Sequence, residues 1–308
     1  GVAGVGVFAK KIIDDSPEIT PDQVKPKGFT SIVLADDGTT EIARFVKSGA
    51  NRVSKSIHEI PEDLQHAFVA VEDERFYDHN GIDLQGIIRA GVIGLTSGDF
   101  SQGASTLTQQ LIKNNVFPEF VNEKTFYDKV KRKLQEQFLA VQIEKQMDKD
   151  AILENYLNTI NLGQNCLGVQ AASKRYFGKD VSELTLSECA VIAGITQSPS
   201  KLNPITNPED NAKRRKKVLD DMLDQGYIDQ AAHDEAMADD VYSRIQNVNN
   251  ITIDNSPYSY FVDALVLQVI DDLMGQLGYT ETQAYNAVYS RGLTIYSTQN
   301  RMMQQNCD

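Results

Sequence analysis

Three acidic residues stand within four positions in the segment AVEDERFYDHNG, which spans residues 70–81. The apolar Leu64, Phe68 and Val71 recur at helical spacing just before them, so Glu72 is expected near the C-terminal end of a helix. Unpaired carbonyl groups at such an end disfavour further negative charge, which favours a proton-accepting role for Glu72, that of a general base. The competing interpretation is a solvated acidic surface.

A glycine- and serine-rich loop runs into a helix in GDFSQGASTLTQQLIKNN, residues 98–115. Thr106 and Gln109 have the spacing of a capping box, in which each side chain bonds the backbone of the other. The free amide groups of the first helical turn would then face any anion in front of them. A capping box alone is usually structural. This segment therefore indicates an anion site only when it is taken together with the other candidate segments.

An acid stands among cations in KVKRKLQEQFLA, residues 129–140. At about 100° per residue, Lys129, Lys133 and Glu136 share one stripe of a helix, and Arg132 lies close to it. Such a group suits a phosphate-bearing substrate, because the cations hold the phosphates while the acid binds a metal or handles a proton. The alternative is a set of surface ion pairs. An apolar stripe is predicted beside the charged one, over a helix at 127–147: Val130, Leu134, Phe138 and Val141.

The net charge of −13 argues against a protein that mainly grips nucleic acid, because phosphate binding needs a surplus of basic residues on one face. Any anionic ligand must therefore meet a local basic patch. The three cysteines, Cys166, Cys189 and Cys307, are widely separated and include no CxxC spacing. They are interpreted as ordinary thiols, with neither a disulfide framework nor a zinc site.

The secondary-structure pattern predicts a mainly helical body between small β elements. A hairpin around Asp37-Gly38 is predicted in the segment SIVLADDGTTEIARF (31–45). A strand is predicted in the segment RGLTIYSTQN (291–300). From Pro61 to about Ala238 the spacing is helical. Besides the segments above, helices are expected at 149–158, 165–176, 185–195, 209–225 and 259–277.

The first nine residues, GVAGVGVFA, are apolar and are followed by Lys10 and Lys11. A helix needs about 20 such residues to cross a bilayer, so this segment is expected to be the tail end of a membrane anchor in a longer polypeptide. A flexible glycine-rich terminus is the alternative. The end at Asp308 is likewise expected to be a truncation.

Five segments, taken together, resemble the successive motifs of the peptidoglycan glycosyltransferases, glycosyltransferase family 51, in the order of that family. They are EDERFYDHNG, GASTLTQQ, RKLQE, ILENYLNTINLG and LTLSECAVIAGITQSPSKLNP. The resemblance covers roughly residues 50–235, and the flanks look like those of bifunctional class A penicillin-binding proteins. It implies a mainly α, lysozyme-like fold with small β elements at both flanks, acting on lipid II, the undecaprenyl-diphosphate disaccharide-pentapeptide.

The resemblance also implies roles for individual residues. Glu72 matches the catalytic base that deprotonates the 4-hydroxyl of the acceptor N-acetylglucosamine, and Asp73 would support it. The reaction then forms a β-1,4 bond with inversion and releases undecaprenyl diphosphate. Glu136 matches a second glutamate, which assists the leaving diphosphate or its metal, with Mg²⁺ or Mn²⁺ as the candidate cofactor. The implied substrate-binding residues are Asp73, Arg75, Ser105, Gln110, Lys113, Arg132, Lys133, Asn161 and Arg214.

Some positions depart from the family pattern or have a second interpretation. Many relatives carry a tyrosine where this chain has Asn161. The run KRRKK (213–217) would face the diphosphate or lipid headgroups through Arg214 and Arg215, or would form a solvated helix face. Glu188, amid apolar neighbours, is expected to be a structural, hydrogen-bonded acid. The SxxK at residues 198–201 lies inside the fifth motif, and no KTG occurs, so it is expected not to acylate with penicillin.

The implied organisation has four parts: an anchor tail and juxtamembrane segment at 1–22, a small β region at 23–57, the glycosyltransferase domain at 58–240, and a linker toward a missing transpeptidase domain at 241–308. The expected location is the extracytoplasmic face of the cell membrane, with a single N-terminal anchor. Expected partners are lipid II, the growing glycan strand, the membrane surface and cell-division or elongation proteins, but no nucleic acid.

Two other functions fit parts of the pattern. A lysozyme-like lytic enzyme that cleaves glycan would share a catalytic glutamate, yet it would need no basic cluster for a diphosphate. A catalytically silent cell-wall scaffold would need neither glutamate.

Overall fold

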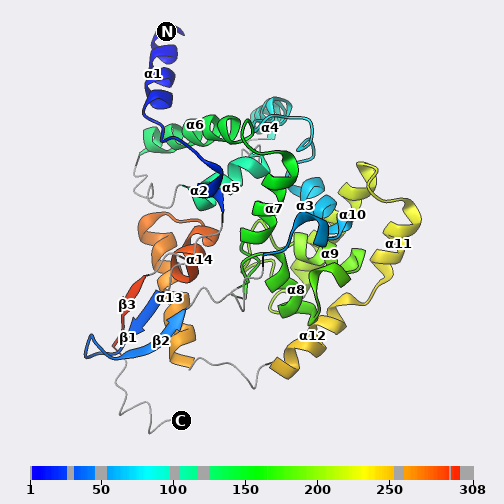
Figure 1. Cartoon of the computed structure of the whole chain (residues 1–308). Coiled ribbons are helices and arrows are strands. Elements are labelled where there is room, and N and C mark those ends of the chain that lie inside the picture. Colours follow the sequence, from blue (N-terminus) through cyan, green and yellow to red (C-terminus); the bar gives the residue numbers. More distant parts are fainter. Residues whose placement is uncertain are drawn as a thin grey trace.

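The computed structural model describes residues 2–25, 31–45, 54–97, 105–116, 125–164, 166–252, 260–290 and 293–298. Helices dominate these residues, and a three-stranded sheet stands to one side with α13 and α14 beside it (Figure 1). The prediction of a mainly α fold with small β elements toward both ends of the chain is confirmed. No helix in the described part of the chain has both the length and the apolar character that a membrane crossing requires.

The helices of the described residues run in chain order as follows. They are α1 (Val2–Asp14), α2 (Pro21–Val24), α3 (Glu62–Glu72), α4 (Leu84–Ser97), α5 (Leu107–Asn115), α6 (Phe126–Ile143), α7 (Lys149–Thr159), α8 (Val169–Phe177), α9 (Leu186–Ala193), α10 (Pro208–Asp224), α11 (Gln230–Ala238), α12 (Val241–Thr252), α13 (Tyr260–Leu277) and α14 (Glu281–Ser290). Two short 3-10 helices lie at Ile57–Glu59 and Val181–Glu183. The predicted helices correspond to α3, α5 to α10 and α13, with ends that differ by a few residues. No individual helix was predicted for α1, α2, α4, α11, α12 or α14.

Side-chain caps decide where several of these helices begin. Thr125 accepts a hydrogen bond from the Asp128 amide at 3.1 Å, so α6 starts directly after it. Thr185 and Glu188 form a reciprocal box at the start of α9. Thr106 accepts from the amide of Gln109 at 3.2 Å at the start of α5. These caps satisfy amide groups that have no partner within their own helix.

The larger hydrophobic core lies among α3, α5, α6, α7, α8, α9 and α10. Phe68 of α3 is fully buried and meets the ring of Tyr156 edge-on, with centroids 6.0 Å apart. Large side chains that are likewise fully buried include Leu64, Leu107, Leu111, Leu139 and Ile152. This core holds the C-terminal end of α3 and the whole of α5 in place, and these are the elements that carry the predicted acid and anion segments.

The three strands are β1 (Ser31–Leu34), β2 (Glu41–Phe45) and β3 (Thr294–Tyr296), in the order β2-β1-β3. The hairpin predicted at Asp37-Gly38 is confirmed: Asp37 accepts from the amide of Thr39 at 2.8 Å, and Gly38 has a φ of +68°. Strand β3 pairs in parallel with β1. The two flanks of the chain therefore meet in one sheet.

This sheet has a hydrophobic core of its own. Residues from both flanks contribute to it together with α13 and α14: Val33, Ala43, Val262, Val266, Ile270, Ala284, Tyr285, Val288 and Ile295. We refer to β1, β2, β3, α13 and α14 as the sheet unit. Sequence patterns had placed its strands in separate regions, 23–57 and 241–308, because pairing between distant strands leaves no local trace.

Candidate active site

Glu72 is the last residue of α3, as predicted, and its side chain is 8% exposed. One carboxylate oxygen accepts a hydrogen bond from Gln110 Nε2 at 3.1 Å, and the other accepts from Thr196 Oγ1 at 2.5 Å. Arg214 Nη2 lies 3.5 Å from the same oxygen as Thr196. These three partners come from α5, the turn after α9 and α10. Glu72 is therefore a buried, oriented carboxylate and not part of a solvated acidic surface.

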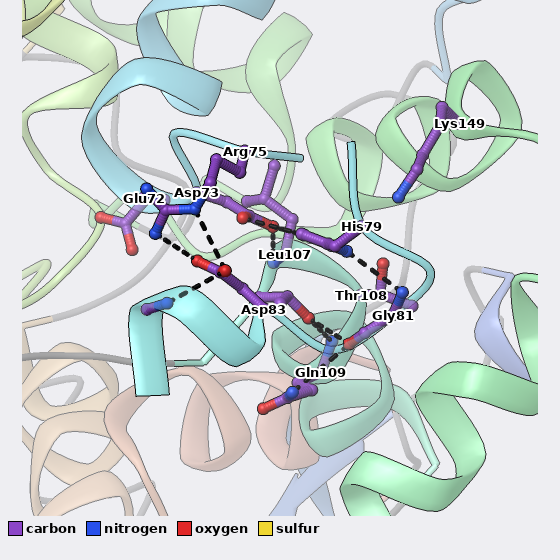
Figure 2. Close-up of polar contacts among 12 residues, drawn as sticks. Glu72, Asp73, Arg75, His79, Gly81, Asp83, Leu107, Thr108, Gln109 and Lys149 are labelled. Carbon is purple, nitrogen blue, oxygen red and sulfur yellow. Dashed lines mark hydrogen bonds and ion pairs between the residues drawn. The ribbon is translucent and has the colours of Figure 1, made fainter. Parts of the chain in front are cut away.

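Asp73 joins the end of α3 to the start of α5. Its Oδ2 accepts from the backbone amide of Leu107 at 2.8 Å, and both of its oxygens lie 3.0 Å from Nε2 of His79 (Figure 2). The amide of Gly81 donates to Nδ1 of His79 at 3.1 Å, so Nδ1 is the acceptor nitrogen and Nε2 carries the proton that bonds Asp73. Asp73 thus ties the loop that follows Glu72 to the start of α5.

Gly81 closes this loop against two helices. Its carbonyl accepts from Thr106 Oγ1 at 2.8 Å and from Gln109 Nε2 at 3.3 Å, both in the first turn of α5 or directly before it. Its Cα faces the backbone of α6, and its φ of +93° is in the left-handed region. The loop can approach α6 this closely only because residue 81 has no side chain.

We expect Gly81→Ala to lower the free energy of unfolding by about 3 to 4 kcal/mol, because strain at positive φ and a backbone clash add together. A Cβ here would lie 2.6 Å from the carbonyl carbon and oxygen of Ala140. Urea denaturation would measure the loss. Gly226→Ala is the matched control: Gly226 has a φ of +77° but no atom within 4 Å of a Cβ, so only the conformational cost of about 1 to 2 kcal/mol should appear. Equal losses in the two variants would contradict the packing argument.

Glu136 of α6 is buried, at 1% exposure, between two cations. Its two oxygens lie 2.9 Å from Arg132 Nη1 and 2.8 Å from Lys133 Nζ. Lys133 Nζ also donates to Ser105 Oγ at 2.6 Å and to Gln109 Oε1 at 3.0 Å. The i,i+4 pair of the alternative interpretation is present between Arg132 and Glu136, but its acid is buried and the neighbouring Lys133 is bonded across to α5.

The buried face of α6 differs from the predicted apolar stripe. Val130, Leu134, Phe138 and Val141 are only half-buried, whereas the fully buried side chains are Gln135, Glu136, Leu139, Ala140 and Ile143. The helix is rotated so that Glu136 faces α5. Charge pairing with Arg132 and Lys133 makes this burial of a carboxylate tolerable, since a buried charge needs a partner.

Helix α5 connects the two acids. Gln109 contacts Lys133, the partner of Glu136, and its neighbour Gln110 contacts Glu72. The hydroxyl of Tyr156 donates to Gln110 Oε1 at 3.3 Å, which turns the amide nitrogen of Gln110 toward Glu72. Burial, together with the nearby negative charges of Glu72 and Asp73, raises the pKa of Tyr156 well above its ordinary value, so the phenol remains a donor.

The other predicted residues are placed as follows. Arg75 is engaged by Asp83, whose oxygens lie 3.1 Å from Nε and 2.5 Å from Nη2, and this guanidinium lowers the pKa of the Asp83 carboxyl (Figure 2). Lys113 is half-buried in the last turn of α5. Asn161 is 0% exposed and accepts from the Gly163 amide at 2.9 Å. This bond stabilises the turn that Asn161 itself starts, and no described contact joins Asn161 to Glu72 or Glu136.

The basic run at 213–217 divides into separate roles. Arg214 is buried beside Glu72, as described above. Arg215 is also buried, and it donates to the carbonyl of Ala236 and lies 5.8 Å from the ring centroid of Tyr242. The lysines form exposed pairs, Lys213 with Asp210, Lys216 with Asp220 and Lys217 with Asp221. The interpretation of this run as a solvated helix face therefore holds for the lysines. Each of the two arginines instead makes its own contact in the interior.

The expectation that Glu188 is a structural, hydrogen-bonded acid is confirmed. Glu188 is buried, caps α9 through the Thr185 amide, and pairs with Lys179 at 2.6 Å. Cys166 and Cys189 are buried free thiols, and burial raises the pKa of Cys166 to about 12. Cys307 lies outside the described residues.

Three residues that contact the site were not singled out from the sequence: Gln109 as a partner of Lys133, Tyr156 and Thr196. Each lies within one of the quoted motif segments, so the motifs themselves were the available signal. Spacing alone could not distinguish them, since Thr196 stands 124 residues after Glu72 in the chain.

The donor set around Glu136 does not fit a resident metal ion. Both carboxylate oxygens are paired with cations, and a second cation would be repelled there. Among the described residues, no three His, Cys, Asp or Glu side chains gather as a protein metal site requires.

A buried carboxylate and a basic cluster on either side of one short helix define a helical enzyme domain suited to an anionic substrate. A family model described as Transglycosylase matches residues 38–223, which is more than half of the chain. The chain belongs to this transglycosylase family, and the resemblance to the peptidoglycan glycosyltransferase domain of class A penicillin-binding proteins is confirmed.

Relatives that share one name, Penicillin-binding protein 1A, come from different bacteria. Penicillin-binding protein 1A of Clostridium botulinum is 39% identical over 317 residues, covering 98% of this chain and 37% of the relative. Penicillin-binding protein 1A of Vibrio cholerae is 40% identical over 305 residues, covering 99% of this chain and 34% of the relative. A crystal structure of Penicillin-Binding Protein 1A from Haemophilus influenzae matches with 21% identity and a TM-score of 0.38, over 91% of this chain and 28% of that one. The chain thus spans little more than a third of the two curated relatives.

Proposed function

We propose that this chain polymerises lipid II into β-1,4-linked glycan with inversion and release of undecaprenyl diphosphate. The proposal rests on the placement of a buried acid and a basic cluster on opposite sides of α5. On one side, Gln110 orients the buried Glu72 carboxylate, and on the other, Gln109 and Glu136 hold Lys133. A proton acceptor and a positive cluster are the two elements that attack on a diphosphate-activated sugar needs.

In the proposed reaction, Glu72 accepts the proton of the 4-hydroxyl of the acceptor N-acetylglucosamine. The freed oxygen bonds to the anomeric carbon of the lipid-linked glycan, and the bond from that carbon to the diphosphate oxygen breaks. Arg132, Lys133 and Lys113 neutralise the charge that develops on the departing diphosphate. Glu136 holds Arg132 and Lys133 in fixed positions, so that little reorganisation is needed during the reaction.

Asp73, Ser105 and Arg214 support these groups through the contacts described above. Asp73 fixes the start of α5, Ser105 accepts from Lys133, and Arg214 lies beside Glu72. Arg75, paired with Asp83, and Asn161, buried in its turn, would act on the substrate through the loops that they stabilise.

A lytic glycan-cleaving enzyme is less well supported, because it has no use for a cluster in which Lys133 bonds Ser105, Gln109 and Glu136 together. Incubation with lipid II tests the proposal: a glycan polymer is the expected product. Release of anhydro-muropeptides from finished sacculi, without polymer from lipid II, would instead identify a lytic enzyme. Turnover of neither substrate would favour a silent scaffold.

Chelation with EDTA is expected to lower the polymerisation rate by less than about tenfold, because Arg132 and Lys133 already place positive charge beside Glu136. The lipid II assay with and without added Mg²⁺ or Mn²⁺ measures this. Complete loss of activity in EDTA, restored by either metal, would show that the cations on the protein do not suffice.

We further infer that the chain works within a longer bifunctional protein at the extracytoplasmic face of the cell membrane. Support comes from the share of the relatives that the chain spans. A following transpeptidase domain, the growing glycan strand and proteins of cell division or elongation are the proposed partners.

A further inference from the structure

Helix α14 of the sheet unit packs against α5, the helix that carries Gln110 and Lys113. Across this contact, Gln283 Nε2 donates a hydrogen bond to the backbone carbonyl of Lys113 at 3.1 Å. Gln283 is 5% exposed, so the bond is shielded from water. Lys113 lies in the last turn of α5. The carbonyl groups of a last turn have no amide partner within their own helix and need donors from elsewhere.

The two ends of the Gln283 amide have different tasks. Its Oε1 accepts from the backbone amide of Thr280 at 2.9 Å, while Thr280 Oγ1 accepts from the amide of Gln283 at 3.2 Å. This pair is a capping box that starts α14. With Oε1 held by the cap, Nε2 is aimed at Lys113. The cap and the contact to α5 can therefore be separated by mutation.

Helix α5 is positioned from both ends. At its start, Asp73 accepts from the amide of Leu107, and near its end Gln283 bonds Lys113. Gln110 and Lys113 are three residues apart and so lie on one face of the helix, one turn from each other. A shift confined to the last turn would move Lys113 while the first turn stays fixed through Asp73.

The donor comes from the sheet unit and not from the core around α5. Ala284 and Val288 of α14 are buried in the core that the sheet unit builds from both flanks of the chain. Helix α14 thus belongs to the core of the sheet unit and at the same time contacts α5.

We propose that Gln283 is a positioning residue that holds the Lys113 turn of α5 in its substrate-binding position and so ties the sheet unit to the active site. This rests on the proposed function, in which Lys113 binds the diphosphate of lipid II. A role in stability alone is the competing explanation.

Gln283→Glu tests the proposal in the whole chain. A glutamate keeps the capping box with Thr280, but its carboxylate cannot donate to the Lys113 carbonyl. We expect KM for lipid II to rise about tenfold with kcat changed less than about twofold. The reason is that a misplaced lysine weakens substrate binding but has little effect on the proton transfer to Glu72. Gln283→Met keeps the length but removes both the donor and the cap acceptor for Thr280, and it should give the same rise in KM if the glutamate variant fails to fold.

Ser200→Ala is the matched control. Ser200 Oγ bonds Glu281 at 3.3 Å, so this variant removes a second contact of α14 that does not involve α5, and its KM should stay at the wild-type value. Unchanged KM in both Gln283 variants would overturn the proposal. So would a fall in melting temperature with KM and kcat affected equally, since that is the result of a merely structural role. A wild-type chain that makes no polymer from lipid II would instead refute the proposed function, which separates the two failures.

Discussion

Glu72→Gln is expected to lower the rate of lipid II polymerisation about a thousandfold or more while the fold stays intact. Glutamine has the size of glutamate, and its oxygen can still accept from Gln110 while its amide nitrogen donates to the Thr196 hydroxyl, but it cannot accept the proton of an attacking hydroxyl. Polymerisation of lipid II would measure the rate, and circular dichroism with a thermal melt would check the fold.

Glu62→Gln provides the control for this variant. Glu62 lies at the exposed N-terminal end of the same helix, α3, so the change removes one negative charge without touching the site. Its rate should equal that of the wild type. Unaltered turnover in Glu72→Gln would show that another group accepts the proton, and an equal loss in both variants would point to net charge as the cause.

Lys133→Ala is expected to lower kcat/KM about a hundredfold, mainly through weaker binding of the substrate. The lysine is the only described side chain that bonds Ser105, Gln109 and Glu136 together, so its loss removes a diphosphate ligand and leaves Glu136 with Arg132 alone. Binding of lipid II, or of the phosphoglycolipid inhibitor moenomycin, would measure the affinity directly.

The comparison is with Lys131→Ala. Lys131 stands two residues earlier, about 200° around α6 from Lys133. The Lys131→Ala variant therefore removes the same charge from another face of the helix. Its affinity for lipid II should be close to that of the wild type. If Lys133→Ala binds lipid II as tightly as Lys131→Ala does, the basic cluster is not the diphosphate site.

Local features could be predicted well because their causes lie within a few residues. The Asp37-Gly38 hairpin depends on bonds from Asp37 to the amides of Thr39 and Thr40. The helix that ends at Glu72 was predicted from the spacing of Leu64, Phe68 and Val71. The proximity of Glu136 to Lys133 and Arg132 was likewise predicted, since three- and four-residue steps along a single helix bring side chains together.

The role of a residue could not be predicted where it depends on packing between distant segments. Arg214 and Arg215 are neighbours in one basic run, yet one lies beside Glu72 and the other bonds the carbonyl of Ala236. Asn161 stands in a motif, yet its side chain is buried and bonded within its own turn. The way in which α10 and the turn at Asn161 pack against the core decides these outcomes.

By itself, the sequence determined the family, the two glutamates, the basic residues that accompany them and most helices, because motif order, charge spacing and capping are properties of short stretches. Only the tertiary structure decided that α5 lies between the two acids, that α6 turns Glu136 inward, and that β1 pairs with β3. These arrangements arise from burial of apolar faces and pairing of buried charges across segments far apart in the chain, and such contacts have no spacing that a linear pattern can display.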